Sequence, residues 1–239
     1  MLFPLGERER ERETDCKITN VINGKTNTLS RPLNQFPVFV RYNEAINIIE
    51  KVKKLNEPSI VEQISSRNPF GLATNIRGTS KKDLHTLLVY SSKEPGYISY
   101  NKIIQGHEYI KKYKIMISRV TSEHAGEPDS DGKYKVISSL KILEPEEVCT
   151  DSYIIAFSSQ EKKYTKNAFN YIKTKFVRFL ILQTLSSINL SRERYEFVPM
   201  QDFSKSWTDE ELYAKYNLTD DEIAFIESMI KPMDLGGDD

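Results

Sequence analysis

The sequence predicts an α+β fold, with a mixed, mainly antiparallel sheet, packed helices and a short helical C-terminal tail. Three observations support this class: β-rich runs fill residues 84–157, helical spacing dominates on both sides of them, and 239 residues with 38% hydrophobic content suffice for a sizeable core. We expect an N-terminal arm and hairpin over residues 1–30, a main domain over 31–203 and a helical acidic tail over 204–239.

The N-terminal part predicts a hairpin followed by two helices. Asn23-Gly24 stands between two short β-rich runs, and this pair readily adopts the positive φ angles of a tight hairpin turn. Residues 43–55 keep apolar side chains at helical spacing and end in lysines, which complement the helix dipole. Ser59 and Glu62 have the spacing of a capping box, so a second, short helix is expected there.

The middle of the chain predicts at least four strands. The β-rich runs are separated by Pro95-Gly96 and by other turns rich in Gly, Pro and acidic residues. They cover residues 84–90, 113–120, 133–143 and 152–157, with a helical turn over 107–113. The apolar side chains of residues 164–188 form one broad face, so we expect a single long helix at the centre of the molecule.

The tail carries two helix-start signals of the same kind. Thr208 is followed three residues later by Glu211, and Thr219 by Glu222, which is the spacing of a capping box. Two short helices are therefore expected in succession. They are expected to pack against their own domain, with docking onto a partner as the alternative.

Charge is distributed unevenly although the chain is formally neutral. Residues 196–239 hold 3 basic and 12 acidic residues, so residues 1–195 hold 31 basic and 22 acidic ones, a net charge of +9 against −9. A basic body of this kind is compatible with a nucleic-acid partner, because the distribution of charge matters more than its sum.

The composition predicts a cytoplasmic protein without a membrane segment. The N-terminus has a four-residue apolar stretch followed by alternating charges, unlike a signal peptide, and no apolar run approaches membrane-spanning length. Cys16 and Cys149 are expected as reduced thiols, because two cysteines in a chain of this length make no disulfide framework.

A catalytic function has one candidate segment, the turn over residues 123–133. Asp129, Asp131 and Lys133 lie there beside His124, and carboxylates with a nearby lysine are what a Mg²⁺-dependent nuclease uses. These groups come from a single turn, whereas nuclease carboxylates usually come from separate positions on a sheet, so a solvated loop is favoured. No GxGxxG, P-loop or GxSxG motif is present, and we predict no catalytic, metal or cofactor residue in this chain.

Polar loops that carry arginine are the better functional candidates. Arginine can bond a guanine edge with two N–H groups, asparagine can do so for adenine, and Ser, Thr and Lys are common phosphate partners. Loops over residues 65–78, 117–135 and 189–195 hold such side chains. The candidate DNA contacts are Arg67, Asn68, Asn75, Arg77, Ser118, Arg119, Thr121, Ser122, Lys133, Arg192 and Arg194.

Six segments occur in an informative order. They are RPLNQFPVFVRYNEAI, SSRNPFGLATN, KYKIMISRVTSEHAG, ILEPEEVCTDSYI, FNYIKTKFVRFL and, most distinctive, FVPMQDFSKSWTDEELYAKYNLTDDEIAFIESMIKPMD. From about residue 15 onward, the chain resembles the C-terminal region of adenine-specific DNA methyltransferases of restriction-modification systems. The resemblance implies a TaqI-like target recognition domain, related in role to type I specificity subunits, that reads DNA while a methyltransferase domain extrudes adenine.

The resemblance also implies what this chain lacks. The family's cofactor loop and Asn-Pro-Pro-aromatic catalytic motif lie upstream, and Asn68-Pro69-Phe70 carries only one proline. S-adenosylmethionine is therefore expected only in a partner or missing domain, and the expected partners are double-stranded DNA and a methyltransferase or nuclease domain or subunit. The alternatives are a small Mg²⁺-dependent restriction endonuclease, and an interaction subunit that docks on a methyltransferase without touching DNA.

Overall fold

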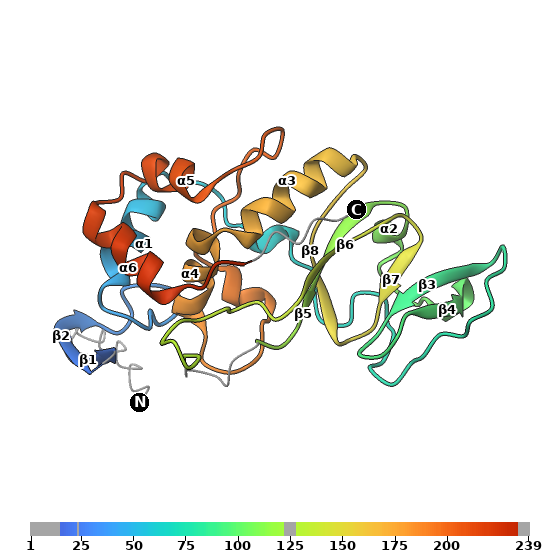
Figure 1. Ribbon diagram of the computed structural model, residues 1–239, viewed down its shortest axis with the longest axis horizontal. Helices are drawn as coiled ribbons and strands as arrows, with labels where there is room; N and C mark the ends of the chain where they lie inside the picture. Colours follow the sequence, from blue (N-terminus) through green and yellow to red (C-terminus); the bar gives the residue numbers. More distant parts are fainter. Residues whose placement is uncertain (1–14, 23, 122–127, 234–239) are drawn as a thin grey trace, which may run out of the picture.

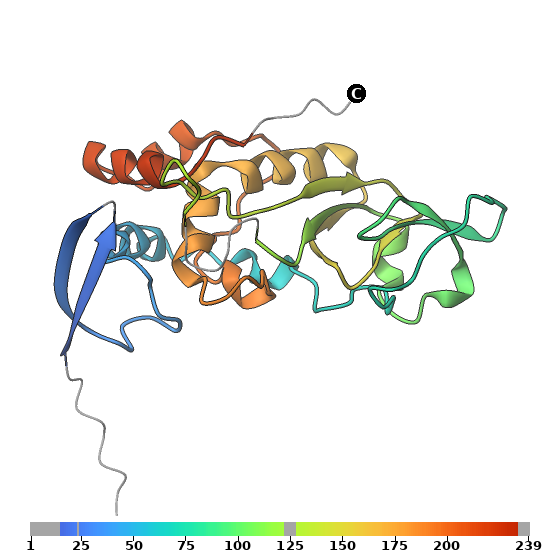
Figure 2. The ribbon, with the colours of Figure 1, turned by 60° about the horizontal axis from the view of Figure 1, so that its bottom comes forward.

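The computed structural model describes residues 15–22, 24–121 and 128–233, in which two three-stranded sheets and a separate hairpin lie along an elongated molecule (Figure 1). Helices gather at the end that carries the hairpin, and the second sheet forms a lobe at the opposite end (Figures 1 and 2). Strand pairs are antiparallel with one exception, so the predicted α+β class with a mainly antiparallel sheet is confirmed.

A central sheet in the order β6-β5-β8 separates two hydrophobic cores. Its strands are β5 (Tyr113–Ser118), β6 (Leu140–Leu143) and β8 (Tyr153–Ser159), and all neighbours are antiparallel. Successive side chains of a strand point to opposite faces. Ile115 and Ile117 therefore enter the larger core, while Met116 between them enters the smaller one.

Helices pack around the larger core. They are α1 (Ala45–Lys54), α3 (Lys162–Lys173), α4 (Lys175–Thr184), α5 (Asp209–Lys215) and α6 (Asp220–Met229). The predicted helix over 43–55 is confirmed as α1, which buries Ile48 and Ile49 in this core. α3 lies along the central sheet, where it contacts β5 and β8 (Figure 2).

The smaller core belongs to a second sheet in the order β4-β3-β7. Its elements are β3 (Thr86–Tyr90), β4 (Gly96–Ser99) and β7 (Glu147–Cys149), with the short helix α2 (His107–Ile110) and the 3₁₀ turn η2 (Tyr100–Lys102) nearby. β4 and β7 were not predicted, because both are short and begin in segments that read as turns. Both segments become strands because they pair with β3, in which Leu88 lies opposite Tyr97 of β4 on one side and Glu147 of β7 on the other.

The predicted N-terminal hairpin is present as β1 (Asp15–Ile22) and β2 (Lys25–Pro32), and Asn23 of its turn lies outside the described residues. The side chain of Asn43 fastens this hairpin to the body by donating to the Ile18 carbonyl at 3.0 Å. Arg31 adds a second anchor, with a 2.6 Å hydrogen bond from its guanidinium to the Val40 carbonyl.

The single long helix expected over residues 164–188 is instead two helices, α3 and α4, divided at Thr174. Thr174 has an extended ψ of 151°, and its hydroxyl accepts from the Val177 N–H at 3.2 Å as the N-cap of α4. The carboxylate of Asp209 accepts from the next two N–H groups, those of Lys175 at 3.0 Å and Phe176 at 2.8 Å. The predicted apolar side chains are buried in both helices, but the two helices run in different directions (Figure 1).

Two shorter predictions also differ from the structure. The segment over 59–66 forms only the 3₁₀ turn η1 (Ile60–Gln63), in which Ser59 accepts from Val61 rather than from Glu62. In the strand predicted over 133–143, only Leu140–Leu143 joins a sheet. Tyr134 instead pairs with the tail, because its N–H donates to the Met229 carbonyl at 2.8 Å, and the Ser139 carbonyl accepts from the Ser118 N–H of β5 at 3.1 Å.

Both predicted tail helices and both capping boxes are confirmed, as α5 after Thr208 and α6 after Thr219. Leu212, Ile226 and Met229 are buried in the larger core together with residues of the central sheet and α4. The tail helices therefore pack against their own chain, as expected.

Candidate nucleic-acid interface

Two of the predicted DNA contacts, Arg67 and Arg119, meet on the carboxylate of Asp151. Arg67 donates to it from Nε at 3.0 and 3.2 Å and from Nη2 at 2.8 Å, in the bidentate arrangement that matches a guanidinium to a carboxylate. Arg119 donates from Nη1 at 2.6 Å to the carboxylate and at 2.6 Å to the Asp151 carbonyl. We call these three residues the Arg67–Asp151–Arg119 cluster.

Each member of this cluster is fixed by a different part of the fold. Arg119 directly follows β5, and its N–H donates to the Ser152 carbonyl at 3.0 Å. Asp151 follows β7, and its N–H donates to the Leu72 carbonyl at 2.8 Å. Arg67 lies in the loop after η1. This loop is fixed by a hydrogen bond from the Ser65 N–H to the Ile155 carbonyl of β8 at 2.7 Å. Three segments that lie far apart in the sequence thus fix the position of one carboxylate.

The cluster keeps a net positive charge at its surface. The side chain of Asp151 is 11% exposed, that of Arg119 is 21% exposed and that of Arg67 is 73% exposed. Burial raises the pKa of Asp151, but the hydrogen bonds and charges of Arg67 and Arg119 outweigh it, so the pKa is lowered overall. Two cations therefore share one permanent anion, and the excess charge lies on the exposed Arg67.

The outer edge of Arg67 is available to a ligand. Its Nε and Nη2 groups face Asp151, and among the described residues its Nη1 group has no hydrogen-bond partner. A guanidinium held from behind in this way presents a planar pair of donors outward, which suits a phosphate or the O6 and N7 acceptors of guanine.

Exposed apolar side chains lie next to Arg119. Val120 and Ile188 are each 44% exposed, and their segments are joined by the hydrogen bond from the Thr121 N–H to the Ile188 carbonyl at 2.8 Å. Leu190 also donates to the Arg119 carbonyl at 2.7 Å, so the 188–190 segment borders the cluster. Apolar side chains beside an arginine are the kind of group that contacts a thymine methyl in the major groove.

Three further predicted contacts direct their cationic groups toward the protein. Arg192, at the start of the 3₁₀ turn η3 (Arg192–Tyr195), pairs with Glu62 of η1 at 3.3 Å. Arg194 donates to the Thr184 carbonyl at the end of α4, and Lys133 donates to the Glu227 carbonyl of α6 at 3.0 Å. Arg192 remains on the surface, whereas Arg194 and Lys133 hold helices in place.

The rest of the predicted loop residues lie outside the cluster. Arg77 donates to the Thr74 and Ile76 carbonyls of its own loop at 2.6 and 2.7 Å. Asn75 is exposed, and Asn68 has a left-handed φ of 56° with its carbonyl accepting from the Gly71 N–H at 3.1 Å. No hydrogen bond or ion pair of the described residues joins these three side chains to Asp151.

The second predicted loop is described only in part. Ser118 is buried at the end of β5, and its hydroxyl donates to the Val120 carbonyl at 3.3 Å. Thr121 is also buried, while Ser122 lies outside the described residues. Ser118 and Thr121 therefore shape the backbone around Arg119.

The described part of the turn over residues 123–133 gives no support to the alternative of a Mg²⁺-dependent nuclease. Lys231 of the tail lies between the two carboxylates, at 2.6 Å from Asp129 and 3.1 Å from Asp131. The hydrogen bond from Lys231 lowers the pKa of Asp129. His124 lies outside the described residues, among which no group of three His, Cys, Asp or Glu side chains could hold a metal ion.

The sequence did not predict Asp151, because the predicted residues are side chains that could contact DNA, whereas Asp151 holds two such side chains in place. Its signal was present: CTDSY places an acidic residue in the turn directly before a strongly apolar strand. A carboxylate at such a position is a common partner for a nearby arginine. Which arginines it holds is a property of the fold, because Arg67 lies 84 residues away from it and Arg119 lies 32 residues away.

Comparison with models of known protein families and with curated proteins finds no match for this chain. Within the described residues, no helix is both long and apolar enough to cross a membrane. Cys16 and Cys149 are not joined by a disulfide.

Proposed function

We propose that this protein is a sequence-specific DNA recognition module of a restriction-modification system, in which the Arg67–Asp151–Arg119 cluster contacts the DNA. The observation that carries the proposal is the cluster itself: two arginines from separate loops share one carboxylate, and the more exposed one presents its outer donors to solvent. The basic excess over residues 1–195 and the sequence resemblance described above support the same function.

In this proposal, a different domain or subunit carries out the methylation of adenine. A methyltransferase domain or subunit binds S-adenosylmethionine and extrudes the target base, while this module sets the sequence at which it acts. Double-stranded DNA is the primary ligand, and cytoplasmic location follows from that role. The tail helices, which bury their apolar sides in the larger core, give no specific support to the alternative of an interaction subunit.

Selection of binding sites from random duplexes tests the proposal, followed by affinity measurements over a range of salt. The wild-type protein is expected to enrich one site, with log affinity falling against log salt by roughly 0.9 for each phosphate contacted. Arg67→Gln and Arg119→Gln are expected to weaken binding to that site by about 1–3 kcal/mol each if they read base edges. Lys54→Gln, an exposed charge on α1, is the matched control and is expected to bind like the wild type.

The salt dependence separates the two kinds of contact. A uniform loss across sequences, with a slope smaller by about one, would assign the arginine to phosphate. Equal binding by wild type and both arginine variants would overturn the proposal, as would the absence of any enriched site with or without a methyltransferase partner.

A further inference from the structure

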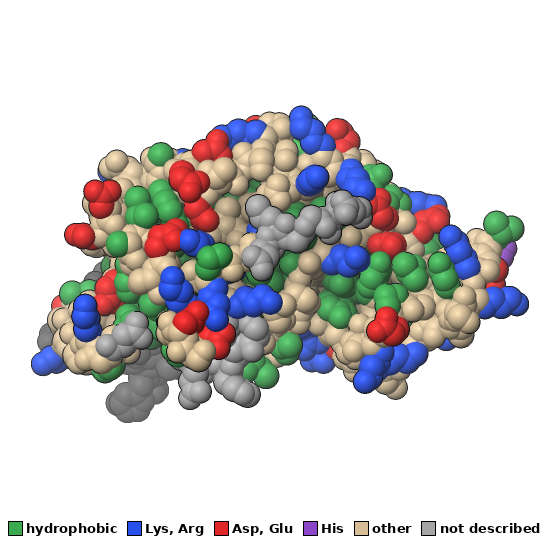
Figure 3. All heavy atoms as spheres, in the orientation of Figure 1, with side chains coloured by type: hydrophobic (Ala, Val, Ile, Leu, Met, Phe, Trp, Pro, Cys, Tyr) green, Lys and Arg blue, Asp and Glu red, His purple; other side chains and the backbone are tan. Residues whose placement is uncertain are grey.

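The sheet β4-β3-β7 has one buried face and one face whose side chains are partly exposed. Leu87, Val89 and Ile98 point into the smaller core. Alternate positions place Leu88, Tyr90 and Tyr97 on the other side, where they are partly exposed, and Tyr90 also packs against the edge of the smaller core. We call these three side chains the tyrosine face. Figure 3 shows hydrophobic side chains gathered over β3 and β7, with Lys, Arg, Asp and Glu side chains around them.

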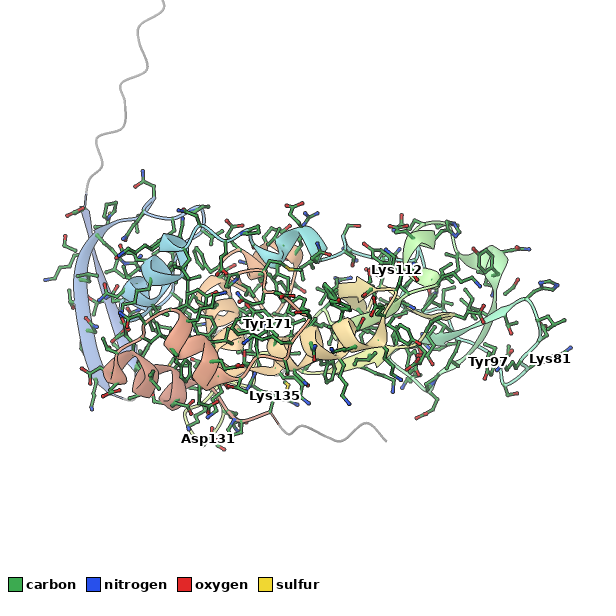
Figure 4. All side chains as sticks on the ribbon, turned by 90° about the horizontal axis from the view of Figure 1, so that it is seen from above. Lys81, Tyr97, Lys112, Asp131, Lys135 and Tyr171 are labelled. Atoms are coloured by element: carbon green, nitrogen blue, oxygen red, sulfur yellow. The ribbon has the colours of Figure 1, made fainter. Side chains whose placement is uncertain are left out.

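Lysines lie over both rings of the tyrosine face. The ammonium of Lys82 is 5.8 Å from the centre of the Tyr97 ring, and that of Lys141 is 5.4 Å from the centre of the Tyr90 ring. Both lysines are exposed, and neither forms an ion pair with any described residue. Figure 4 places Lys81 on the same end of the molecule as Tyr97, so a further cation lies nearby.

The carboxylates that border this face are already bonded. Glu144 pairs with Lys162 at 2.6 Å, and Glu146 pairs with Lys111 at 2.9 Å. Glu147 accepts from the Tyr90 hydroxyl at 3.3 Å and from the Glu144 N–H at 2.9 Å. The donors to Glu147 are neutral, so its carboxylate keeps its charge, and Lys82 interacts electrostatically with Glu146. Counting Lys82, Lys111, Lys141 and Lys162 against Glu144, Glu146 and Glu147 leaves an excess of one positive charge at the tyrosine face, and its complement is an anion.

We propose that the tyrosine face binds single-stranded nucleic acid, with bases on the Tyr90 and Tyr97 rings and phosphates on Lys82 and Lys141. A flat sheet surface with aromatic rings suits unpaired bases, which can turn a ring face outward. A duplex keeps its bases stacked inside, so the rings would have no partner there. This site is separate from the Arg67–Asp151–Arg119 cluster and does not depend on the function proposed for it.

Fluorescence anisotropy with a labelled oligothymidine of about 12 nucleotides tests this site at low salt. Tyr97→Leu, which keeps an apolar β-strand residue, is expected to weaken binding at least about fivefold, because one base–ring stack is lost. The double variant Lys82→Gln/Lys141→Gln is expected to lower the salt slope by about 1.4, since each phosphate on a single strand adds roughly 0.7. Lys25→Gln/Lys54→Gln, two exposed charges outside this face, should bind like the wild type.

The arms of the experiment keep the two proposed sites apart. Arg67→Gln/Arg119→Gln is expected to lose duplex binding while it retains oligothymidine binding, and the Lys82/Lys141 variant is expected to show the reverse. The proposal is overturned if the wild type does not bind oligothymidine at low salt, or if the Lys25/Lys54 control loses as much affinity as Lys82→Gln/Lys141→Gln. Equal competition by polyglutamate or by a duplex of the same length would overturn it as well.

Discussion

Asp151 gives the candidate interface its geometry. Arginine side chains in loops are usually mobile, and an exposed ion pair contributes little to stability. Here one carboxylate, 11% exposed and fixed by its own backbone hydrogen bond to Leu72, binds Arg67 through two nitrogens and Arg119 through one. In the proposed complex with DNA, the arginines would therefore lose less conformational freedom than free side chains would.

Replacement of Asp151 by Asn separates positioning from simple charge. The change removes a negative charge from the proposed DNA-binding surface, so attraction to the phosphates alone predicts tighter binding to every sequence. If Asp151 positions the two arginines, the D151N variant should instead lose discrimination between its selected site and a scrambled duplex, by about 1–3 kcal/mol. Competition binding with both duplexes measures the difference. Tighter binding with discrimination unchanged would show that Asp151 does not position them.

Lys114 is a second residue whose environment can be tested. Its side chain is fully buried on β5, and its ammonium donates to the carbonyls of Lys112 at 2.8 Å and Glu144 at 2.9 Å. Burial lowers the pKa of Lys114 to about 8, although Glu147 and Glu144 oppose the shift. At neutral pH the folded protein thus carries a buried positive charge.

The pH dependence of stability should reveal this charge. Below about pH 8 both folded and unfolded states hold the proton, so the full cost of burial is present. Between about pH 8 and the ordinary lysine value the unfolded state binds more protons, so stability should rise with pH, by roughly 3 kcal/mol in total. Denaturant unfolding of wild type and Lys114→Met across pH 7–11 gives the difference. A constant difference would contradict a lowered pKa.

At the scale of elements, the junction of α3 and α4 shows how the tail is tied to the body. Asp209, the first residue of α5, occupies the N-terminus of α4 and bonds two of its N–H groups. An acidic side chain there satisfies donors that the helix itself leaves open and complements its dipole. The division at Thr174 and the docking of α5 are therefore parts of one arrangement.

Asp209→Ala is expected to destabilise the protein by about 0.5–2 kcal/mol, the range for loss of a helix cap. Asp209→Asn, which keeps one acceptor oxygen, should lose less. Glu210→Ala, an exposed neighbour in the same turn, is the control and should lose least. Urea unfolding followed by circular dichroism measures all three, and equal losses for Asp209→Ala and Glu210→Ala would contradict the capping role.

The sequence predicted those elements that are determined by residues close together in the chain. Both tail capping boxes, α1 and the Asn23-Gly24 hairpin are of this kind. The break at Thr174 was not predicted, because Asp209, which accepts from the first N–H groups of α4, is 34 residues away from Lys175. β7 was missed for the same reason, since its three residues are a strand only beside β3. In the candidate site, the sequence identified the two arginines but not the carboxylate that joins them.

At the scale of the whole molecule, the two cores share the central sheet, so they should unfold together. Leu143 of β6 lies in the smaller core and Leu212 of α5 in the larger one, and both are fully buried. Leu143→Ala and Leu212→Ala should each destabilise the protein by about 2–5 kcal/mol. Fluorescence of Trp207, the single tryptophan, and far-UV circular dichroism should report one transition in both variants. Non-coincident curves for Leu143→Ala would show that the lobe unfolds separately.

The shared carboxylate has one further consequence for how DNA would be read. Because Arg67 and Arg119 both bond Asp151, the separation of their guanidinium groups is limited by the width of a single carboxylate. If the pair binds DNA as proposed, it would accept only base steps that present two acceptors at the matching separation. Changes in the local rise or roll of the duplex would change the distance between the two acceptors without altering any base. The cluster would therefore discriminate by the shape of the DNA as well as by its base sequence.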